Sequence, residues 1–167
     1  MNAVPLSNLP RLVPPSKRLL GLDVGSRTIG LAISDATWTV ATPVRTLARS
    51  RLASDLGALA VIVRELEAGG IVVGLPMQMD GREGPRCQSV RQFVRDMVRI
   101  LDLPVAFWDE RLSTAAVERI LIGEADLSRK RRKQVVDRSA AAWILQGALD
   151  ALRHAAAAAV SKSSDEP

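Results

Sequence analysis

Four acidic residues occupy positions where they could do chemistry together. Asp23 ends an apolar run and precedes Gly25, Asp109 and Glu110 follow another apolar run, and Asp137 lies in the first turns of an apolar helical stripe. One histidine and one cysteine disfavour a zinc site or Cys/His catalysis. Carboxylates are ligands of Mg²⁺ or Mn²⁺, and these ions accept phosphate oxygens in their remaining positions. The acids together predict metal-assisted hydrolysis of a phosphodiester.

Each acid also has an ordinary structural explanation. Asp23 could cap the turn that follows it, because Asp side chains hydrogen-bond to nearby backbone groups. The other acids could pair with the adjacent arginines, Arg111 and Arg138, as exposed ion pairs of little energetic consequence. These alternatives stay open for each single acid, whereas the three positions together favour a metal site.

Three antiparallel strands are expected first. Residues 19–24 form an apolar run and residues 29–33 alternate apolar and small or polar side chains, so the two predict a β-hairpin around Gly25. Residues 38–47 predict a third strand, with Pro43 at a sheet edge or a bulge. The first part of the chain is therefore a meander that carries Asp23.

Helices and strands then alternate. Apolar spacing predicts helices over residues 52–66 and 90–101, and buried strands over 71–75 and 105–108. Gly69 and Gly70 are expected to end the first helix. Strand, helix, strand connections imply parallel pairing. The sequence thus predicts a mixed five-stranded α/β sheet with helices on both faces.

The loop over residues 76–85 follows a strand at its carboxyl end, where open α/β sheets place binding loops, although a plain surface loop is an alternative. Ser113 is expected to cap a helix to about residue 122. Before the last helix lies a basic run that could contact phosphates or form a solvated loop: Arg129, Lys130, Arg131, Arg132 and Lys133.

Composition sets the class of protein. The 167 residues, 47% hydrophobic and 25% charged, predict one globular domain over residues 18–154, with a flexible leader at 1–17 and a disordered tail at 155–167. The net charge of +5 favours an anionic partner, usually nucleic acid. Without a signal peptide or a run of about 18 apolar residues, we expect no membrane partner and a cytoplasmic location.

Four segments carry a resemblance to a known family. They read D-V-G-S-R-T-I-G-L-A-I-S-D at 23–35, V-V-G-L-P at 72–76, D-E-R-L-S-T at 109–114 and V-D-R-S-A-A-A-W-I-L-Q at 136–146. Over about residues 18–152 the chain resembles the YqgF or RuvX family, also called Holliday junction resolvases. The resemblance implies an RNase H-like fold, similar to RuvC resolvase. It also implies a Mg²⁺- or Mn²⁺-dependent endonuclease that processes the 5′ end of precursor 16S rRNA, resolves Holliday junctions, or does both.

The resemblance also assigns roles. It implies that Asp23, Glu110 and Asp137 are the catalytic, metal-binding acids, with Asp109 as a neighbour that could substitute or assist. Nucleic-acid contacts are expected from Arg27, Arg111 and the basic run.

One departure concerns an acid that many RNase H-like proteins place at the end of the fourth strand, where this chain has Gly74, Leu75 and Pro76. Glu110 would have to reach toward Asp23 from two strand spacings away, roughly 9 to 10 Å.

Two other functions compete with the nuclease. The D-x-G hairpin is also found in actin-like and sugar-kinase phosphotransferases, but these duplicate the RNase H-like unit and this chain is long enough for only one. A non-catalytic ribosome-assembly factor could keep the fold and the basic run. A homodimer is expected if the substrate is a junction, because two strands are then cut symmetrically.

Overall fold

The computed structural model describes residues 2–112 and 129–164, with side chains from residue 140 onward in the second range. A five-stranded sheet with the order β3-β2-β1-β4-β5 forms its centre. The first three strands pair antiparallel, and β4 and β5 run parallel to β1. The strands are β1 (Arg18–Val24), β2 (Thr28–Ser34), β3 (Ala41–Ala48), β4 (Ala68–Leu75) and β5 (Val105–Asp109). The predicted mixed sheet is confirmed.

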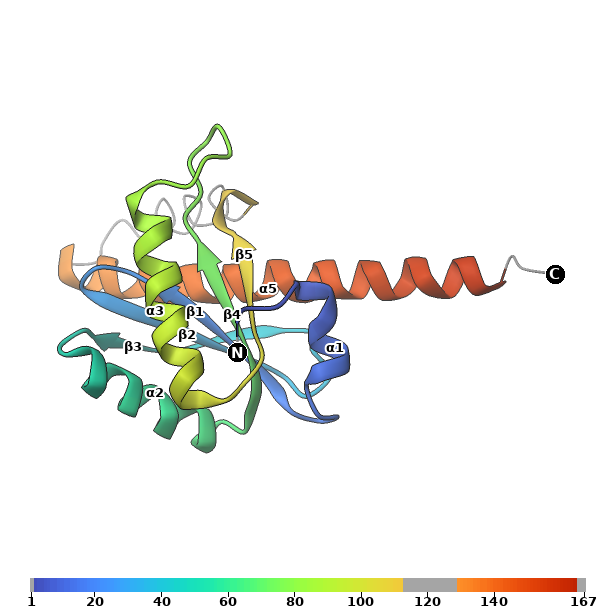
Figure 1. Cartoon of the computed structure of the whole chain (residues 1–167), viewed down its shortest axis with the longest axis horizontal. Coiled ribbons are helices and arrows are strands. Elements are labelled where there is room, and N and C mark those ends of the chain that lie inside the picture. Colours follow the sequence, from blue (N-terminus) through green and yellow to red (C-terminus); the bar gives the residue numbers. More distant parts are fainter. Residues whose placement is uncertain (1, 113–128, 165–167) are drawn as a thin grey trace.

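Helices cover both faces of the sheet (Figure 1). Helices α2 (Leu52–Glu65) and α3 (Pro85–Leu101) pack on one face, and α5 (Arg129–Ser164) crosses the other. Short helical turns are η1 (Leu6–Asn8), α1 (Leu9–Leu12) and η2 (Glu110–Leu112). Within the described ranges, each helix is too short or too polar to cross a membrane.

Strand β1 divides its side chains between two cores. Leu20 and Leu22 are buried with α2 and α3, whereas Leu19 is buried with α5. Gly21 also faces α5, because a Cβ there would lie only 2.7 Å from Leu145 Cβ. Since alternate strand residues share a face, Asp23 continues the row that α5 covers.

Several element boundaries differ from the expectation: helix α3, for example, begins at Pro85, five residues before its expected start. Gly69 and Gly70 do not end the preceding helix but belong to β4; the chain turns at Glu67, whose φ is 54°. Strand β3 begins later than expected because Asp35 Oδ1 accepts hydrogen bonds from the backbone N–H groups of Thr39 and Val40, at 2.7 and 3.0 Å. These bonds hold residues 35–40 as a turn.

Pro43 sits where its missing N–H is tolerated. Strand β3 is at the edge of the sheet, and its register with β2 shifts beside Pro43. Both expectations for this proline, an edge position and a bulge, are confirmed.

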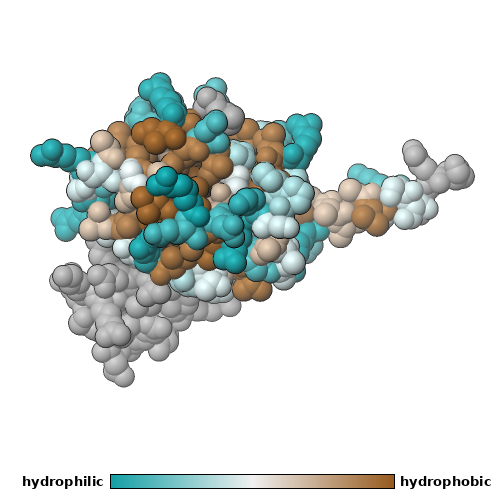
Figure 2. Space-filling model, turned by 90° about the horizontal axis from the view of Figure 1, so that it is seen from below, coloured by the Kyte–Doolittle hydropathy of each residue, from teal (hydrophilic) through white to brown (hydrophobic). Residues whose placement is uncertain are grey.

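Both chain ends differ from the expected leader and tail. Leu9 and Val13 are buried in the core under α5, and Val4 N–H donates to Val105 O at 2.7 Å, so the first residues pack as part of the fold. The sequence does not predict this helical turn, because proline in a helix interior breaks the helix. Proline is nevertheless compatible with the first turn of a helix, where Pro10 lies. At the other end, α5 continues to Ser164 and projects from the body with an exposed, alanine-rich surface (Figure 2). The helix expected from Ser113 lies outside the described residues.

Candidate active site

Asp23 lies near the carboxyl end of β1, half-buried, opposite Gly30 of β2. The turn that follows is closed by a hydrogen bond from Gly25 N–H to Thr28 O at 2.8 Å. Arg49, from beyond the end of β3, donates through Nη1 to Gly25 O at 2.9 Å. The hairpin that carries Asp23 is therefore fixed from two sides. The sequence analysis missed Arg49, because nothing in its local pattern indicates a contact 24 residues away.

Glu110 reaches Asp23 across a glycine. Glu110 follows β5, Gly74 lies on β4 between β5 and β1, and a Cβ on Gly74 would lie 2.6 Å from Glu110 Oε1. The Glu110 side chain thus occupies the space that a side chain at position 74 would need. Strand β4 carries no acid. Its Gly74 instead leaves room for Glu110, the acid that follows β5.

Burial and the nearby Asp23 carboxylate, in that order, raise the pKa of Glu110 to about 7, with a smaller raising effect from Asp109 and a lowering effect from Arg86. Two carboxylates that repel each other in a partly desolvated place favour either a shared proton or a bound cation. The structure therefore brings together two of the three predicted catalytic acids.

Asp109 pairs with Arg111. The guanidinium of Arg111 donates from Nε and Nη2 to Asp109 Oδ2 at 2.9 and 2.6 Å, and this bond lowers the pKa of Asp109. This is the pairing with an adjacent arginine that the sequence left open. Asp109 holds Arg111 in place, and Arg111 itself lies beside the loop at Gly81, where a Cβ would be 3.4 Å from its Nη1.

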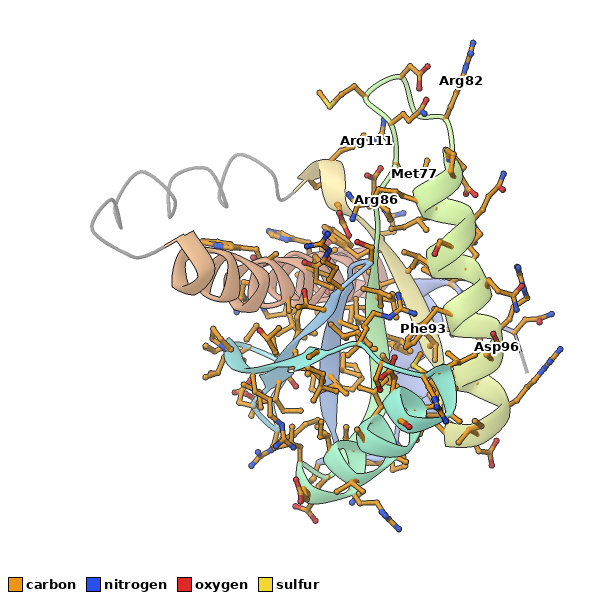
Figure 3. The ribbon with its side chains drawn as sticks, turned by 90° about the vertical axis from the view of Figure 1, so that its left-hand side faces the viewer. Met77, Arg82, Arg86, Phe93, Asp96 and Arg111 are labelled. Atoms are coloured by element: carbon orange, nitrogen blue, oxygen red, sulfur yellow. The ribbon has the colours of Figure 1, made fainter. Side chains whose placement is uncertain are left out.

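Arginines gather at this end of the sheet. Figure 3 shows Arg82, Arg86 and Arg111 at the same end of the molecule, around the ends of β4 and β5. Arg27 is exposed in the turn after Asp23. Arg86 was missed by the sequence analysis, although its place in the first turn of α3, directly after the expected binding loop, was a usable signal. These cations could contact phosphates near the acids.

The remaining predicted residues lie on the first turns of α5, and their side chains are outside the described set. The sequence predicts that the basic run at 129–133 precedes this helix. In the structure the run forms the first turns of the helix instead. Asp137 is one helical turn before Ala141, and Ala141 and Ile144 are buried in the core between α5 and the sheet. Ile144 also approaches Gly74, since its Cδ1 would lie 2.5 Å from a Cβ there.

Gln146 fastens α5 to the sheet. Its Oε1 accepts from Ala41 N–H at 2.9 Å, and its Nε2 donates to Thr39 O at 2.9 Å. These bonds fix the position of α5 along the strands. Because Asp137 is on the same helix, they also help to set where Asp137 lies relative to the sheet.

Two of the predicted metal ligands, Asp23 and Glu110, have side chains that the structure describes. Among the described side chains, no three His, Cys, Asp or Glu residues come together. The pair of Asp23 and Glu110 supplies carboxylate oxygens. Burial first, and the Asp23 charge second, raise the pKa of Glu110, and a divalent cation would offset both by stabilising the ionised carboxylate. The residues present therefore fit Mg²⁺ or Mn²⁺, while the full ligand set with Asp137 stays a prediction.

Known proteins resemble this chain in sequence and in fold. Residues 17–151 match the family model described as "RuvX: Holliday junction resolvase". A protein of Phenylobacterium zucineum (strain HLK1) named "Putative pre-16S rRNA nuclease" is 54% identical over 92% of this chain and 99% of its own length. A protein of the same name from Rhodospirillum rubrum is 56% identical over 84% of this chain and 87% of its own.

Among solved structures, "T. thermophilus RuvC in complex with Holliday junction substrate" superposes with a TM-score of 0.53 and 15% identity, over 81% of this chain and 94% of that one. At this identity the likeness concerns the fold, which is the RuvC-like RNase H fold. The sequence matches decide the family: the chain belongs to the RuvX family of Holliday junction resolvases.

Proposed function

We propose that this protein is a metal-dependent endonuclease that hydrolyses phosphodiester bonds in structured nucleic acid. The observation that carries the proposal is the pairing of Asp23 with Glu110 across Gly74, on the sheet face that α5 covers. A half-buried pair of like charges costs stability, and it is explained if the pair holds a cation during the reaction. The names of the relatives from Phenylobacterium and Rhodospirillum agree with nuclease activity.

The proposed roles follow from the chemistry of each side chain. Asp23, Glu110 and Asp137 would hold Mg²⁺ or Mn²⁺, with Glu110 in its ionised form. The chemistry that such an ion would supply when bound is to orient a water, to lower the pKa of that water and to stabilise the charge that develops on the phosphoryl group. Arg86 and Arg111 bind phosphates next to the cleaved bond.

Substrate binding away from the centre is assigned to Arg27 and the basic run at the start of α5. These side chains supply charge for backbone contacts that do not depend on base identity. The proposed substrate is the 5′ end of precursor 16S rRNA, by the name that the relatives share. The second proposed substrate is a four-way DNA junction. If the protein cuts junctions, it acts as a homodimer, because symmetric cleavage of two strands needs two active sites.

The test is cleavage by the purified full chain. A labelled precursor 16S rRNA fragment and a labelled four-way junction are incubated with Mg²⁺, with Mn²⁺ and with a chelator. We expect site-specific cutting of the RNA that requires the metal. Tight binding of the RNA without cutting under any of these conditions would replace the nuclease with the non-catalytic assembly factor.

A further inference from the structure

A cavity of about 660 Å³ lies between α1, the loop that joins β2 and β3, and the outer half of α5. Its apolar lining includes Leu12, Val13, Pro14, Trp38, Leu149 and Leu152. Lys17, which also lines it, directly precedes β1, whereas Asp23 lies near the other end of that strand. The cavity is therefore separated from the candidate active site by about 20 Å, six residues of extended chain.

The walls of this cavity are held together by polar contacts. The indole Nε1 of Trp38 donates to Lys17 O at 2.8 Å, which joins the β2–β3 loop to the segment that follows α1. The loop itself is held by the Asp35 carboxylate, through its bonds to Thr39 and Val40. A cavity whose walls are fixed in advance costs a ligand little ordering entropy.

Backbone strain is concentrated at the same place. Within the described ranges, four residues other than glycine have a positive φ. Two of them lie at helix ends, where left-handed residues are common: Asp102 directly follows α3, and Glu67 is two residues beyond the end of α2. The other two are Ser16 and Trp38, at 67° and 56°, and both line the cavity. Such strain costs about 1 to 3 kcal/mol per residue and tends to gather at functional sites.

Among the described residues, the charged side chains that line the cavity are all cationic: Arg11, Lys17 and Arg153. Lys17 pairs with Glu67 at 3.8 Å and Arg153 with Asp150 at 3.0 Å, but these pairs are solvent-exposed and therefore weak. A bound carboxylate could compete for these cations at little cost.

We propose that this cavity binds a short acidic peptide segment of a partner protein that carries apolar side chains. The apolar side chains enter between Trp38 and Leu152, and the carboxylates meet Arg11, Lys17 and Arg153. The lining is dominated by aliphatic and proline side chains, and the N–H of Trp38 is already bonded within the protein. This surface suits aliphatic groups better than the hydrogen-bonding edges of nucleobases, so a peptide is favoured over a nucleic-acid strand.

Three labelled hexapeptides test the proposal by fluorescence anisotropy with the full chain. The first has three aspartates followed by two leucines and a phenylalanine; the second replaces its apolar residues with serine; the third replaces its aspartates with lysine. We expect saturable binding of the first only, in the range of roughly 1 to 100 µM, because both the apolar and the acidic parts are needed. Equal binding of the serine peptide, or no binding of the first, overturns the proposal.

Variants locate the binding. The double variant Arg11→Glu and Arg153→Glu should bind the first peptide at least about tenfold more weakly than the parent, because two attractive contacts become repulsive. Leu12→Gln, at a side chain that is already 44% exposed, tests the apolar wall. Matched controls on α3 are Arg99→Glu and Ile100→Gln, both exposed and away from the cavity, which should leave binding unchanged. Equal weakening by the controls would show that binding is elsewhere.

Two further measurements separate the outcomes. Thermal melts of every variant show whether a loss of binding reflects unfolding. A ten-nucleotide uridylate strand is added as a competitor. If this strand displaces the peptide, and if the Arg11 and Arg153 double variant binds the strand more weakly than the parent does, the cavity binds nucleic acid. The peptide proposal is then wrong. None of these measurements uses nuclease activity, so they stand apart from the proposed function.

Discussion

Glu110 lies in the space above Gly74, where a Cβ would approach its Oε1 to 2.6 Å and Ile144 Cδ1 to 2.5 Å. The absence of a side chain on β4 therefore lets an acid from the end of β5 come close to the acid on β1. The arrangement explains how two carboxylates meet in a sheet whose fourth strand carries none at this position.

Gly74→Ala should displace Glu110 and reduce cleavage. The added methyl group must push aside Glu110 or Ile144, and overpacking of this kind costs about 1 to 3 kcal/mol of unfolding free energy. The matched control is Gly57→Ala in α2, where a Cβ would meet nothing within 4 Å. The control should be neutral or stabilising by roughly 0.5 to 1 kcal/mol. Urea unfolding and metal-dependent cleavage are measured for both, and unchanged cleavage by Gly74→Ala would contradict the role given to this glycine.

The stability of the metal-free protein should fall between pH 4.5 and pH 7. Glu110 has a folded pKa of about 7 against an ordinary 4.5, so in this window the unfolded chain has lost a proton that the folded chain still holds. The loss amounts to up to about 3 kcal/mol and is complete above pH 7. Glu110→Gln removes the ionisable group and with it this loss. The unfolding free energy of the variant relative to the parent should therefore increase with pH, as measured by urea unfolding with a chelator present. A gain that does not depend on pH would contradict the raised pKa.

Divalent metal should bind more tightly above pH 7 than below it, because the cation requires ionised Glu110. The thermal shift produced by Mg²⁺ should therefore be larger at pH 8 than at pH 6. Arg86→Gln removes a charge that lowers the pKa of Glu110, so it should move this pH dependence upward. Arg95→Gln, on the same helix, serves as its control. A pH dependence that is the same in both variants would remove Arg86 from the site.

Asp23→Asn should keep the fold and lose the metal-dependent cutting. The substitution nearly preserves size but removes the charge that a divalent ion needs, while substrate binding persists through Lys and Arg elsewhere. If Asp23 only capped its turn, asparagine would serve nearly as well. Thermal stability, substrate affinity and Mg²⁺-dependent cutting are compared with the parent, and parental cutting by a well-folded variant refutes the catalytic assignment.

Neutralising the basic run, with glutamine at each of its five positions, should weaken nucleic-acid binding for all sequences. Each phosphate contact releases counterions, so the dependence of the logarithm of the binding constant on the logarithm of salt concentration should flatten. Affinity is measured over a series of salt concentrations with two unrelated RNA sequences. A slope equal to that of the parent would show that these residues do not meet the backbone.

The sequence by itself determined the order of strands and helices and the positions of the acids. Alternation in β1 and β2 and the helical spacing in α2 and α3 are local patterns, so each could be interpreted without knowledge of its neighbours. The four motifs by themselves also carry the resemblance to the family. Asp23 and Glu110 could be named in this way because one lies at the carboxyl end of a recognisable strand and the other directly follows such a strand.

Only the tertiary structure decided how these parts meet. That Gly74 provides room for Glu110, that Arg111 is held by Asp109, and that Arg49 fixes the turn after Asp23 depend on contacts between residues on different elements or on side-chain geometry. The packing of Leu9 and Val13 under α5 escaped the sequence pattern for the same reason, since a short turn with a proline has no periodicity of its own. Local pattern fixes an element, whereas the raised pKa of Glu110 arises from burial and a charge that only folding brings near.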